Sequence, residues 1–232
     1  MVRELPELRD RTLVFRDRRE AGEVLGRMLE GQLPARAKIL AIPAGGVPVA
    51  VPIAEALELP FDVAVVSKVT PSWNSEVGYG AVAFDGRVRL DAKSMACLRV
   101  DEREARKGVE RTLAKVRRRV QSLSEGSPAV VTRGDTAVLV DDGLASGFTM
   151  MIAIEAVRDA GASGVIVAIP TGSESAVNRV ASSADEVYCA NVRTGWSFAV
   201  ADAYESWFDV DDATLLDMLK QIRLSRTRSP AG

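Results

Sequence analysis

The sequence contains no histidine, and this absence limits its chemistry more than any motif does. A Ser-His-Asp triad, a Cys-His pair and a histidine-ligated metal are all excluded. Cysteine is also scarce: Cys97 and Cys189 lie far apart and belong to no CxxC pattern, which argues against a disulfide framework or a thiolate zinc site. Any catalysis must therefore depend mainly on carboxylates, lysine, backbone amides or a hard metal ion.

A strong excess of charge of either sign is absent too. The chain has 30 basic and 32 acidic residues, so no overall positive field attracts nucleic acid or an anionic membrane. No apolar run approaches the roughly 18 residues of a membrane span, and the N-terminal segment is charged throughout. We expect a cytoplasmic protein with no nucleic-acid or membrane partner, and we interpret the basic cluster Arg117 to Arg119 as a solvated helix face.

Apolar runs alternate with helical patterns along most of the chain. An amphipathic helix is expected after Asp17, another beginning at Pro48 or Pro52, a β-hairpin near 80–90 and a long surface helix over 101–123. Strands are expected over 38–43, 61–69, 136–141, 164–169 and 186–189, with helices over 149–160 and 173–182. This order predicts an α/β fold with a mostly parallel sheet flanked by helices, in which ligands bind beyond the carboxyl ends of the strands.

The stretch "VLVDDGLASGFTM", residues 138–150, combines the end of an expected strand with a small-residue turn into a helix. The free amides at a helix N-terminus favour an anion, and the hydroxyls of Ser146 and Thr149 add donors, so the turn suits a phosphate. Asp141 and Asp142 would repel that phosphate directly, but they could accept hydrogen bonds from vicinal hydroxyls nearby or lie close to Mg²⁺. A phosphate beside a diol describes a ribose 5-phosphate.

Other interpretations of this stretch compete with the first. The aspartates could simply cap the following helix, with the small residues forming a tight turn. A nucleotide-triphosphate loop and a dinucleotide loop are both excluded, because the chain has no GxxxxGK[ST] and no GxGxxG after an expected strand. A receiver domain can also contain "VLVDD", but here that motif lies past the midpoint of the chain.

The stretch resembles the signature with which type I phosphoribosyltransferases bind 5-phosphoribosyl-1-pyrophosphate. Three more segments are similar to parts of that family: a pyrophosphate loop, a flexible catalytic loop and the carboxyl-terminal segment of a subgroup of uncharacterised predicted phosphoribosyltransferases. These are "LAIPAGGVPVA", "VSKVTPSWNSEVGYGAV" and "SFAVADAYESWFDVDD" respectively. The resemblance covers about residues 12–215. It implies one domain over 1–232, with a core over about 35–190 and a small hood formed by about 191–215 and the N-terminal segment.

The resemblance also implies roles for individual residues. Asp141 and Asp142 would hold the ribose hydroxyls and act with Lys68 in catalysis. Gly45 and Gly46 would let the backbone approach a magnesium-bound pyrophosphate. Lys68, Glu76 and Tyr79 would lie at or on the closing loop. The residues expected around the 5-phosphate are Gly143, Ala145, Ser146, Gly147, Phe148 and Thr149. Trp207, with Trp196, Tyr204 and Phe208, could stack on a planar base or pack internally.

The implied reaction transfers ribose 5-phosphate from 5-phosphoribosyl-1-pyrophosphate to a nitrogenous base, with Mg²⁺ as cofactor. One departure weakens the match, because Ala44 stands where close relatives have a basic residue directed at the pyrophosphate. Three hypotheses follow: an active transferase, a regulatory protein that binds phosphoribosyl ligands or nucleotides with weak or no catalysis, and a phosphosugar hydrolase or lyase. The acceptor base is undefined by sequence, and a homodimer is an open expectation.

Overall fold

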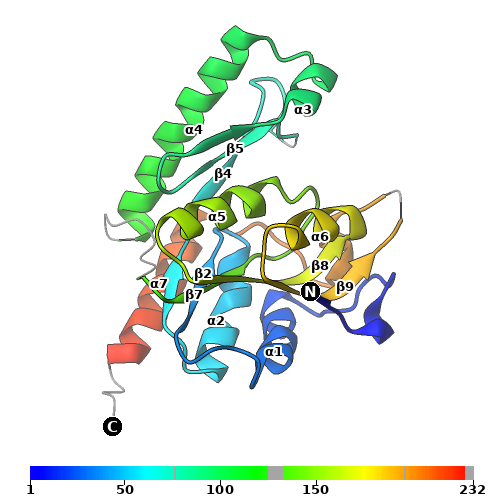
Figure 1. Ribbon diagram of the computed structural model, residues 1–232, viewed down its shortest axis with the longest axis vertical. Coiled ribbons are helices and arrows are strands. Elements are labelled where there is room, and N and C mark those ends of the chain that lie inside the picture. Colours follow the sequence, from blue (N-terminus) through cyan, green and yellow to red (C-terminus); the bar gives the residue numbers. More distant parts are fainter. Residues whose placement is uncertain (76, 125–132, 196, 228–232) are drawn as a thin grey trace.

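The computed structural model describes residues 1–75, 77–124, 133–195 and 197–227. They form two sheets of unequal size, and helices cover both faces of the larger one (Figure 1). Glu76 and Trp196, two residues expected near the site, lie outside the described residues. None of the described helices is both long and apolar enough to cross a membrane.

The larger sheet has six parallel strands in the order β1-β9-β8-β7-β2-β3. Its strands are β1 (Val2–Arg3), β2 (Ala37–Ala41), β3 (Phe61–Val63), β7 (Thr136–Val140), β8 (Gly164–Ser173) and β9 (Glu186–Arg193). Four consecutive β7 residues, 137–140, are fully buried, which explains their uninterrupted apolar sequence. The predicted fold class is confirmed, and β7, which carries the aspartates, is a central strand.

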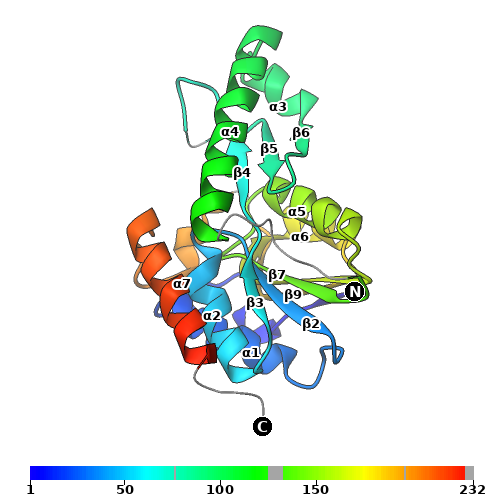
Figure 2. The same cartoon turned by 90° about the vertical axis from the view of Figure 1, so that its left-hand side faces the viewer.

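Helices pack on the two faces of this sheet as the alternating pattern predicted. One face carries α1 (Arg18–Leu29) and α2 (Gly46–Ala56), with α7 (Asp212–Thr227) packed against α2, whereas the other face carries α5 (Phe148–Asp159) and α6 (Glu174–Ala181) (Figures 1 and 2). Two short 3₁₀ helices, η1 (Pro6–Leu8) and η2 (Val200–Ala203), complete this part of the chain. The sequence interpretation missed α7, although its buried residues Leu215, Leu219 and Ile222 recur at helical spacing. The 3₁₀ helices are too short to show an apolar period.

The first two helices show how local sequence sets their position. Asp17 caps α1, since its carboxylate accepts a hydrogen bond from the Glu20 amide at 2.9 Å. The expected start of α2 at one of its prolines is wrong, because the helix begins at Gly46. Pro48 is tolerated because it occupies the first turn, where an amide has no intrahelical acceptor, and Pro52 lies inside the helix.

The predicted strand over 61–69 is in fact two strands in different sheets. β3 ends at Val63, and β4 (Val66–Val69) begins a smaller antiparallel sheet with β5 (Gly80–Ala83) and β6 (Val88–Leu90). The intervening residues 64–65 are fully buried, so the apolar run continues across the change of sheet and gave no signal of it. The hairpin predicted near 80–90 is confirmed as the β5–β6 pair.

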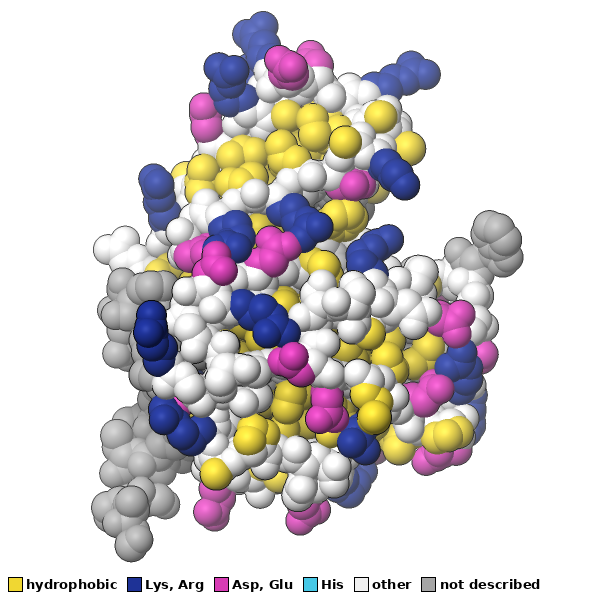
Figure 3. Space-filling model, in the orientation of Figure 1, with side chains coloured by type: hydrophobic (Ala, Val, Ile, Leu, Met, Phe, Trp, Pro, Cys, Tyr) yellow, Lys and Arg dark blue, Asp and Glu magenta, His cyan; other side chains and the backbone are white. Residues whose placement is uncertain are grey.

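Two further helices join the small sheet to form an upper lobe (Figures 1 and 2). They are α3 (Ala92–Cys97), which the sequence did not reveal, and α4 (Glu102–Leu123), whose bounds agree with the predicted long helix. Ion pairs of Arg87 with Asp159 and of Arg89 with Glu155 connect this lobe to α5. Figure 3 shows hydrophobic side chains gathered over the upper lobe and charges of both signs at its junction with the core.

Strands β8 and β9 extend beyond their expected ends at 169 and 189. Turn-forming residues such as Gly172 and Asn191 indicated an earlier end. The strands remain paired there, and the buried Thr171 hydroxyl donates to the side-chain oxygen of Asn191 at 2.6 Å. This extension gives β8 a free edge against which the candidate phosphate turn packs.

Candidate active site

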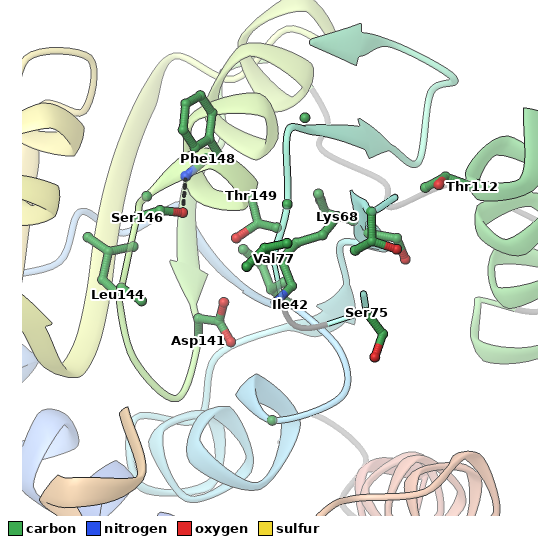
Figure 4. Close-up of a pocket in the computed structure, with 18 of the residues that line it drawn as sticks. Ile42, Lys68, Ser75, Val77, Thr112, Asp141, Leu144, Ser146, Phe148 and Thr149 are labelled. Carbon is green, nitrogen blue, oxygen red and sulfur yellow. Dashed lines mark hydrogen bonds between the residues drawn. The ribbon is translucent and has the colours of Figure 1, made fainter. Parts of the chain in front are cut away.

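A cavity of about 950 Å³ lies between the carboxyl ends of the central strands and the upper lobe (Figure 4). Its floor comes from the β2–α2 loop and from the segment after β7. Figure 4 shows Asp141 and Ser146 on the core side and Thr112, from α4, on the opposite side. The lining contains most of the predicted site residues, namely Ala44, Gly45, Lys68, Asp141, Asp142, Gly143, Ala145, Ser146, Gly147, Phe148 and Thr149.

The two aspartates follow β7 directly and face this cavity. The Asp142 amide donates to Oδ1 of Asp141 at 2.9 Å, so the carboxylates share one local turn. Neither aspartate caps α5, whose N-cap is Gly147 and has no side-chain hydrogen bond. The capping interpretation of these aspartates is therefore wrong, because neither carboxylate bonds with the N-terminus of α5.

The surroundings of the pair raise the pKa of both carboxyls. For Asp141, burial is the main cause and the neighbouring Asp142 charge adds to it. Burial also raises the pKa of Asp142, although the guanidinium of Arg18 opposes that shift. A polar group that donates hydrogen bonds to these carboxylates would therefore relieve an unfavourable desolvation.

The turn after the aspartates is held from outside by β8 and α6. Leu144 bonds with the β8 edge in both directions, donating to the Thr171 carbonyl at 2.9 Å and accepting from the Ser173 amide at 3.0 Å. Arg179 of α6 donates to the Ser146 carbonyl. Gly147 has a φ of 78°, a conformation that favours glycine, and the first amides of α5 follow it. The turn is thus a braced helix N-terminus that opens into the cavity, suited to an anion.

The β2–α2 loop approaches the aspartates so closely that only glycine fits. A Cβ at Gly45 would overlap the carboxylate of Asp142, and one at Gly46 would overlap the Val140 carbonyl. Gly45 and Ala44 line the cavity, whereas the buried Gly46 begins α2 and is absent from the lining. The peptide bond between Pro43 and Ala44 is cis. The loop therefore brings backbone, without any basic side chain of its own, to the carboxylate pair.

Arg18 is a central component that the sequence interpretation missed. Its Nε and Nη2 atoms each lie 2.9 Å from Oδ2 of Asp142, and its Nη1 donates to the Phe208 carbonyl at 2.8 Å. The side chain is only 7% exposed. Arg18 thus links the N-terminal helix, the aspartate pair and the C-terminal segment. It directly follows Asp17, and nothing in the local pattern indicated a partner 124 residues away.

The C-terminal aromatic residues pack around this arginine. The Arg18 guanidinium lies 3.7 Å from the Trp207 ring centroid, and Tyr204 contacts Trp207 with ring centroids 5.2 Å apart. Trp207 does not line the cavity, and Phe208 lies largely exposed elsewhere. Trp207 therefore packs internally, against Tyr204 and Arg18, and the Arg18 guanidinium covers one face of its indole ring.

Two residues expected at the closing loop have different positions. Lys68, on β4, lies exposed at the cavity. Tyr79 is fully buried behind β5, where it packs against Gly108 of α4, and it does not line the cavity. Of these two residues, therefore, only Lys68 faces the space in which a ligand could bind.

The basic residues of the upper lobe are a further feature that the sequence interpretation missed. Lys93 of α3 and Arg111, Lys115 and Arg119 of α4 line the cavity. The interpretation of the α4 cluster as a solvated face is thus wrong for Arg119, although Arg117 and Arg118 are exposed outside the cavity. The sequence did contain a signal for this position, because Arg111, Lys115 and Arg119 are four residues apart and so share one side of the helix.

Removing the Tyr204 hydroxyl should loosen the aspartate pair. This hydroxyl is buried and donates to the Asp142 carbonyl at 2.6 Å, so Tyr204→Phe leaves that carbonyl without its donor. We expect a loss of about 1 kcal/mol in the free energy of unfolding, measured by urea denaturation. Tyr188→Phe, which removes a hydrogen bond to Glu186 far from the cavity, is the matched control. Only Tyr204→Phe should also weaken ribose 5-phosphate binding; equal binding by both variants would contradict this role.

The fold and the cavity define a class: parallel α/β proteins that present a braced helix N-terminus and paired carboxylates at the end of a central strand. The chain belongs to the type I phosphoribosyltransferase family, since residues 35–204 match the model of the phosphoribosyl transferase domain. The crystal structure of TT1426 from Thermus thermophilus is similar, with a TM-score of 0.72 and 32% identity over 90% of this chain and 99% of that one.

Two Mycobacterium tuberculosis proteins, from strains CDC 1551 and H37Rv, are also similar and carry the provisional name of phosphoribosyl transferase. Each is 35% identical over 221 residues, which cover 94% of this chain and 49% of theirs. The chain therefore spans about half the length of these relatives.

Proposed function

We propose that this protein transfers the ribose 5-phosphate group of 5-phosphoribosyl-1-pyrophosphate to a nitrogenous base. The observation that carries the proposal is the placement of Asp141 and Asp142 beside a braced helix N-terminus, at the end of the central strand and inside the cavity. A phosphate turn and a diol-binding carboxylate pair match the two parts of a ribose 5-phosphate. Membership in the phosphoribosyltransferase family supports the same reaction class.

In this proposal the cavity holds the donor along its floor. The 5-phosphate accepts hydrogen bonds from the amides and hydroxyls of residues 145–149. The ribose 2- and 3-hydroxyls donate to Asp141 and to the oxygen of Asp142 that Arg18 leaves available. The cavity volume of about 950 Å³ also leaves room for an acceptor beside C1.

The donor set for Mg²⁺ is small. No group of three or more His, Cys, Asp or Glu side chains suited to a metal ion occurs among the residues that the structure describes. The Asp141–Asp142 pair fits an ion that keeps most of its ligands from water and from substrate phosphates, as Mg²⁺ commonly does. Bound there, Mg²⁺ would neutralise part of the pyrophosphate charge.

The reaction breaks the bond between C1 and the pyrophosphate oxygen and forms a bond from C1 to a base nitrogen. The electron pair of the broken bond leaves with pyrophosphate, and the nitrogen releases its proton to solvent. The protein's part is to align the two reactants and to stabilise charge, because it has no histidine for general acid–base catalysis. Asp141 and Asp142 lie where positive charge develops on the ribose ring, so their carboxylates favour that state electrostatically.

Pyrophosphate release from the donor tests the proposal against its alternatives. The assay supplies 5-phosphoribosyl-1-pyrophosphate and Mg²⁺, with and without each member of a panel of purine and pyrimidine bases. Release that requires a base supports the transferase. Release without any base indicates a hydrolase, whereas tight donor binding with no release for any base indicates a regulatory binding protein.

Ala44→Arg should strengthen the hold on pyrophosphate. Ala44 lines the cavity in the β2–α2 loop, which carries no cation, so an added guanidinium supplies a charge-assisted hydrogen bond. We expect about 1 to 3 kcal/mol tighter binding of the pyrophosphate-bearing donor, and weaker dependence on Mg²⁺ than in the parent. Calorimetry with the donor measures the gain. Ribose 5-phosphate is the control ligand, and an equal gain for it would show that the loop faces a different part of the ligand.

A further inference from the structure

The proposed donor occupies the core side of the cavity and leaves the opposite wall to the acceptor. Under the proposed function, the turn at 145–149 holds the 5-phosphate, the aspartate pair holds the ribose hydroxyls and the β2–α2 loop holds the pyrophosphate. These three segments all lie at the carboxyl ends of the core strands. Figure 4 places Thr112, from α4, across the cavity from Asp141. The upper lobe therefore supplies the wall that faces an acceptor.

Positive charge is concentrated on this wall. Among the described residues that line the cavity, the carboxylates are Asp141 and Asp142, both at the end of β7. The basic residues in the same described lining all come from the upper lobe: Lys68, Lys93, Arg111, Lys115 and Arg119. The whole chain has 30 basic and 32 acidic residues, so overall composition does not explain the cluster. The wall thus favours a ligand group with negative charge.

Three of these residues form one face of α4. Arg111, Lys115 and Arg119 are four positions apart, so they lie along the same side of the helix, and we name them the α4 basic face. The neighbouring row, Thr112 and Val116, is buried, and α4 packs on β4 and β5. The packing of α4 thus fixes the direction in which its basic face points.

Lys115 is the least neutralised member of the α4 basic face. Arg111 bonds with Glu104 at 3.1 Å, and Arg119 pairs with Asp212 of α7. Lys115, between them, makes no ion pair within the parts of the chain that the structure describes. Burial is the main cause that lowers the pKa of Lys115, and the charge of Arg119 adds to it. An anion beside Lys115 would offset both effects.

Apolar side chains accompany the basic ones on this wall. Val77, which precedes β5, and Leu98, which follows α3, both line the cavity and are partly buried. A planar ring packs favourably on such side chains. The wall therefore combines a surface for a heterocycle with a cation for an acid group.

A single carboxylate matches the charge on this wall better than the alternatives do. A neutral base would leave the Lys115 ammonium partly desolvated without a counterion, whereas a carboxylate supplies a charge-assisted hydrogen bond. A phosphate would bring about two negative charges, although Arg111 and Arg119 are already paired with carboxylates. One negative charge corresponds to the one ammonium of the α4 basic face that lacks an ion pair among the described residues.

We propose that the acceptor is a nitrogen heterocycle that carries a carboxylate, and that Lys115, assisted by Arg119, binds this carboxylate. The inference rests on the proposed function and names the class of acceptor, while the donor keeps its pyrophosphate at the β2–α2 loop. In the transfer, the lone pair of a ring nitrogen forms the bond to C1, and the electron pair of the C1–oxygen bond leaves with pyrophosphate. Any proton on that nitrogen passes to solvent. The carboxylate takes no part in these bond changes, so Lys115 sets specificity through binding.

Pairs of rings that differ only in the acid group test this assignment. The probes are uracil-6-carboxylate with uracil, pyridine-3-carboxylate with pyridine-3-carboxamide, and imidazole-4-carboxylate with imidazole-4-carboxamide, each supplied with the donor and Mg²⁺. In the parent, the preferred carboxylate should release pyrophosphate with a kcat/KM about tenfold or more above that of its neutral partner, the scale of one charge-assisted hydrogen bond. Lys115→Met should abolish most of this preference, mainly by raising KM.

Two further variants control for the loss of a lysine. Arg118→Met should keep the preference, since Arg118 lies on the same helix, exposed and outside the cavity. Lys115→Arg should keep it as well, because the positive charge remains. Thermal unfolding of each variant shows whether α4 still folds. Equal rates for the acidic and neutral members of every pair in the parent would overturn the assignment without reference to any variant.

A binding arm separates the acceptor's acid group from the donor's phosphates. On protein saturated with ribose 5-phosphate and magnesium pyrophosphate, calorimetry should show that the carboxylate probe still binds, about tenfold more weakly in Lys115→Met. Pyrophosphate that displaces the probe, or that itself loses affinity in Lys115→Met, would show that Lys115 binds the donor and would overturn the assignment. If ribose 5-phosphate fails to bind the parent, the proposed function fails, and titration of the probes alone still decides whether Lys115 binds an acid group.

Discussion

Asp142→Ala should lower the free energy of unfolding by about 3 kcal/mol, the lower end of the range for removing one partner of a buried ion pair. The reason is Arg18, which is 7% exposed and would lose the carboxylate that its Nε and Nη2 atoms contact. Its remaining bond to the Phe208 carbonyl does not neutralise the charge. The lower end applies because the Asp142 side chain is itself 17% exposed.

A double-mutant cycle separates this effect from a simple loss of packing. Arg18→Met combined with Asp142→Ala removes both charges, so the pair should lose less stability than the sum of the single variants. Urea denaturation of the four proteins gives the coupling energy. Strict additivity would mean that Arg18 does not depend on Asp142, contrary to the contacts in the structure.

Unlike Asp142→Ala, Asp141→Asn should raise the stability of the ligand-free protein. It should also weaken the binding of ribose 5-phosphate. Among the described residues, no arginine contacts Asp141 as Arg18 contacts Asp142, and burial raises the pKa of Asp141 above the ordinary value of 3.8. We expect ribose 5-phosphate to bind about ten- to a hundredfold more weakly, because hydroxyl bonds to a charged acceptor are lost. Calorimetry with ribose 5-phosphate measures this loss.

The pH dependence of stability follows from the direction of the Asp141 shift. A carboxyl whose pKa is higher in the folded state contributes stability that is complete below its unfolded value, and that contribution is lost as the pH rises through the folded value. The metal-free Asp141→Asn protein should therefore unfold at a higher temperature than the parent at pH 7, with the difference shrinking toward pH 4, near the ordinary value of 3.8. A lower unfolding temperature for the variant across that range would contradict this account of Asp141.

The turn between β7 and α5 could be predicted from sequence because its elements are contiguous. Strand, carboxylates and helix start all lie within residues 138–150, and the chemistry of each part is local. The β2–α2 loop was recognisable for the same reason, although the need for glycine at Gly45 arises from a carboxylate at Asp142. Local patterns thus indicated the floor of the cavity.

The walls of the cavity depend on contacts between distant segments. Arg18 reaches the aspartates only because α1 packs beside the end of β7, and a charged residue near a helix start is usually exposed. The local sequence around Lys115 is that of a solvent-exposed lysine. Lys115 lines the cavity because the upper lobe places α4 over it. The change of sheet between Val63 and Val66 was equally hidden, since the apolar residues 63–66 that join the two strands are all buried.

Isothermal titration calorimetry with 5-phosphoribosyl-1-pyrophosphate, with and without Mg²⁺, tests the central claim most directly. The account predicts one binding site per chain, tighter binding when Mg²⁺ is present, and at least tenfold weaker binding in Asp141→Asn, as expected for a lost charge-assisted hydrogen bond. Absence of binding under both conditions, or equal affinity in the parent and in Asp141→Asn, would contradict the claim that this cavity holds the phosphoribosyl donor.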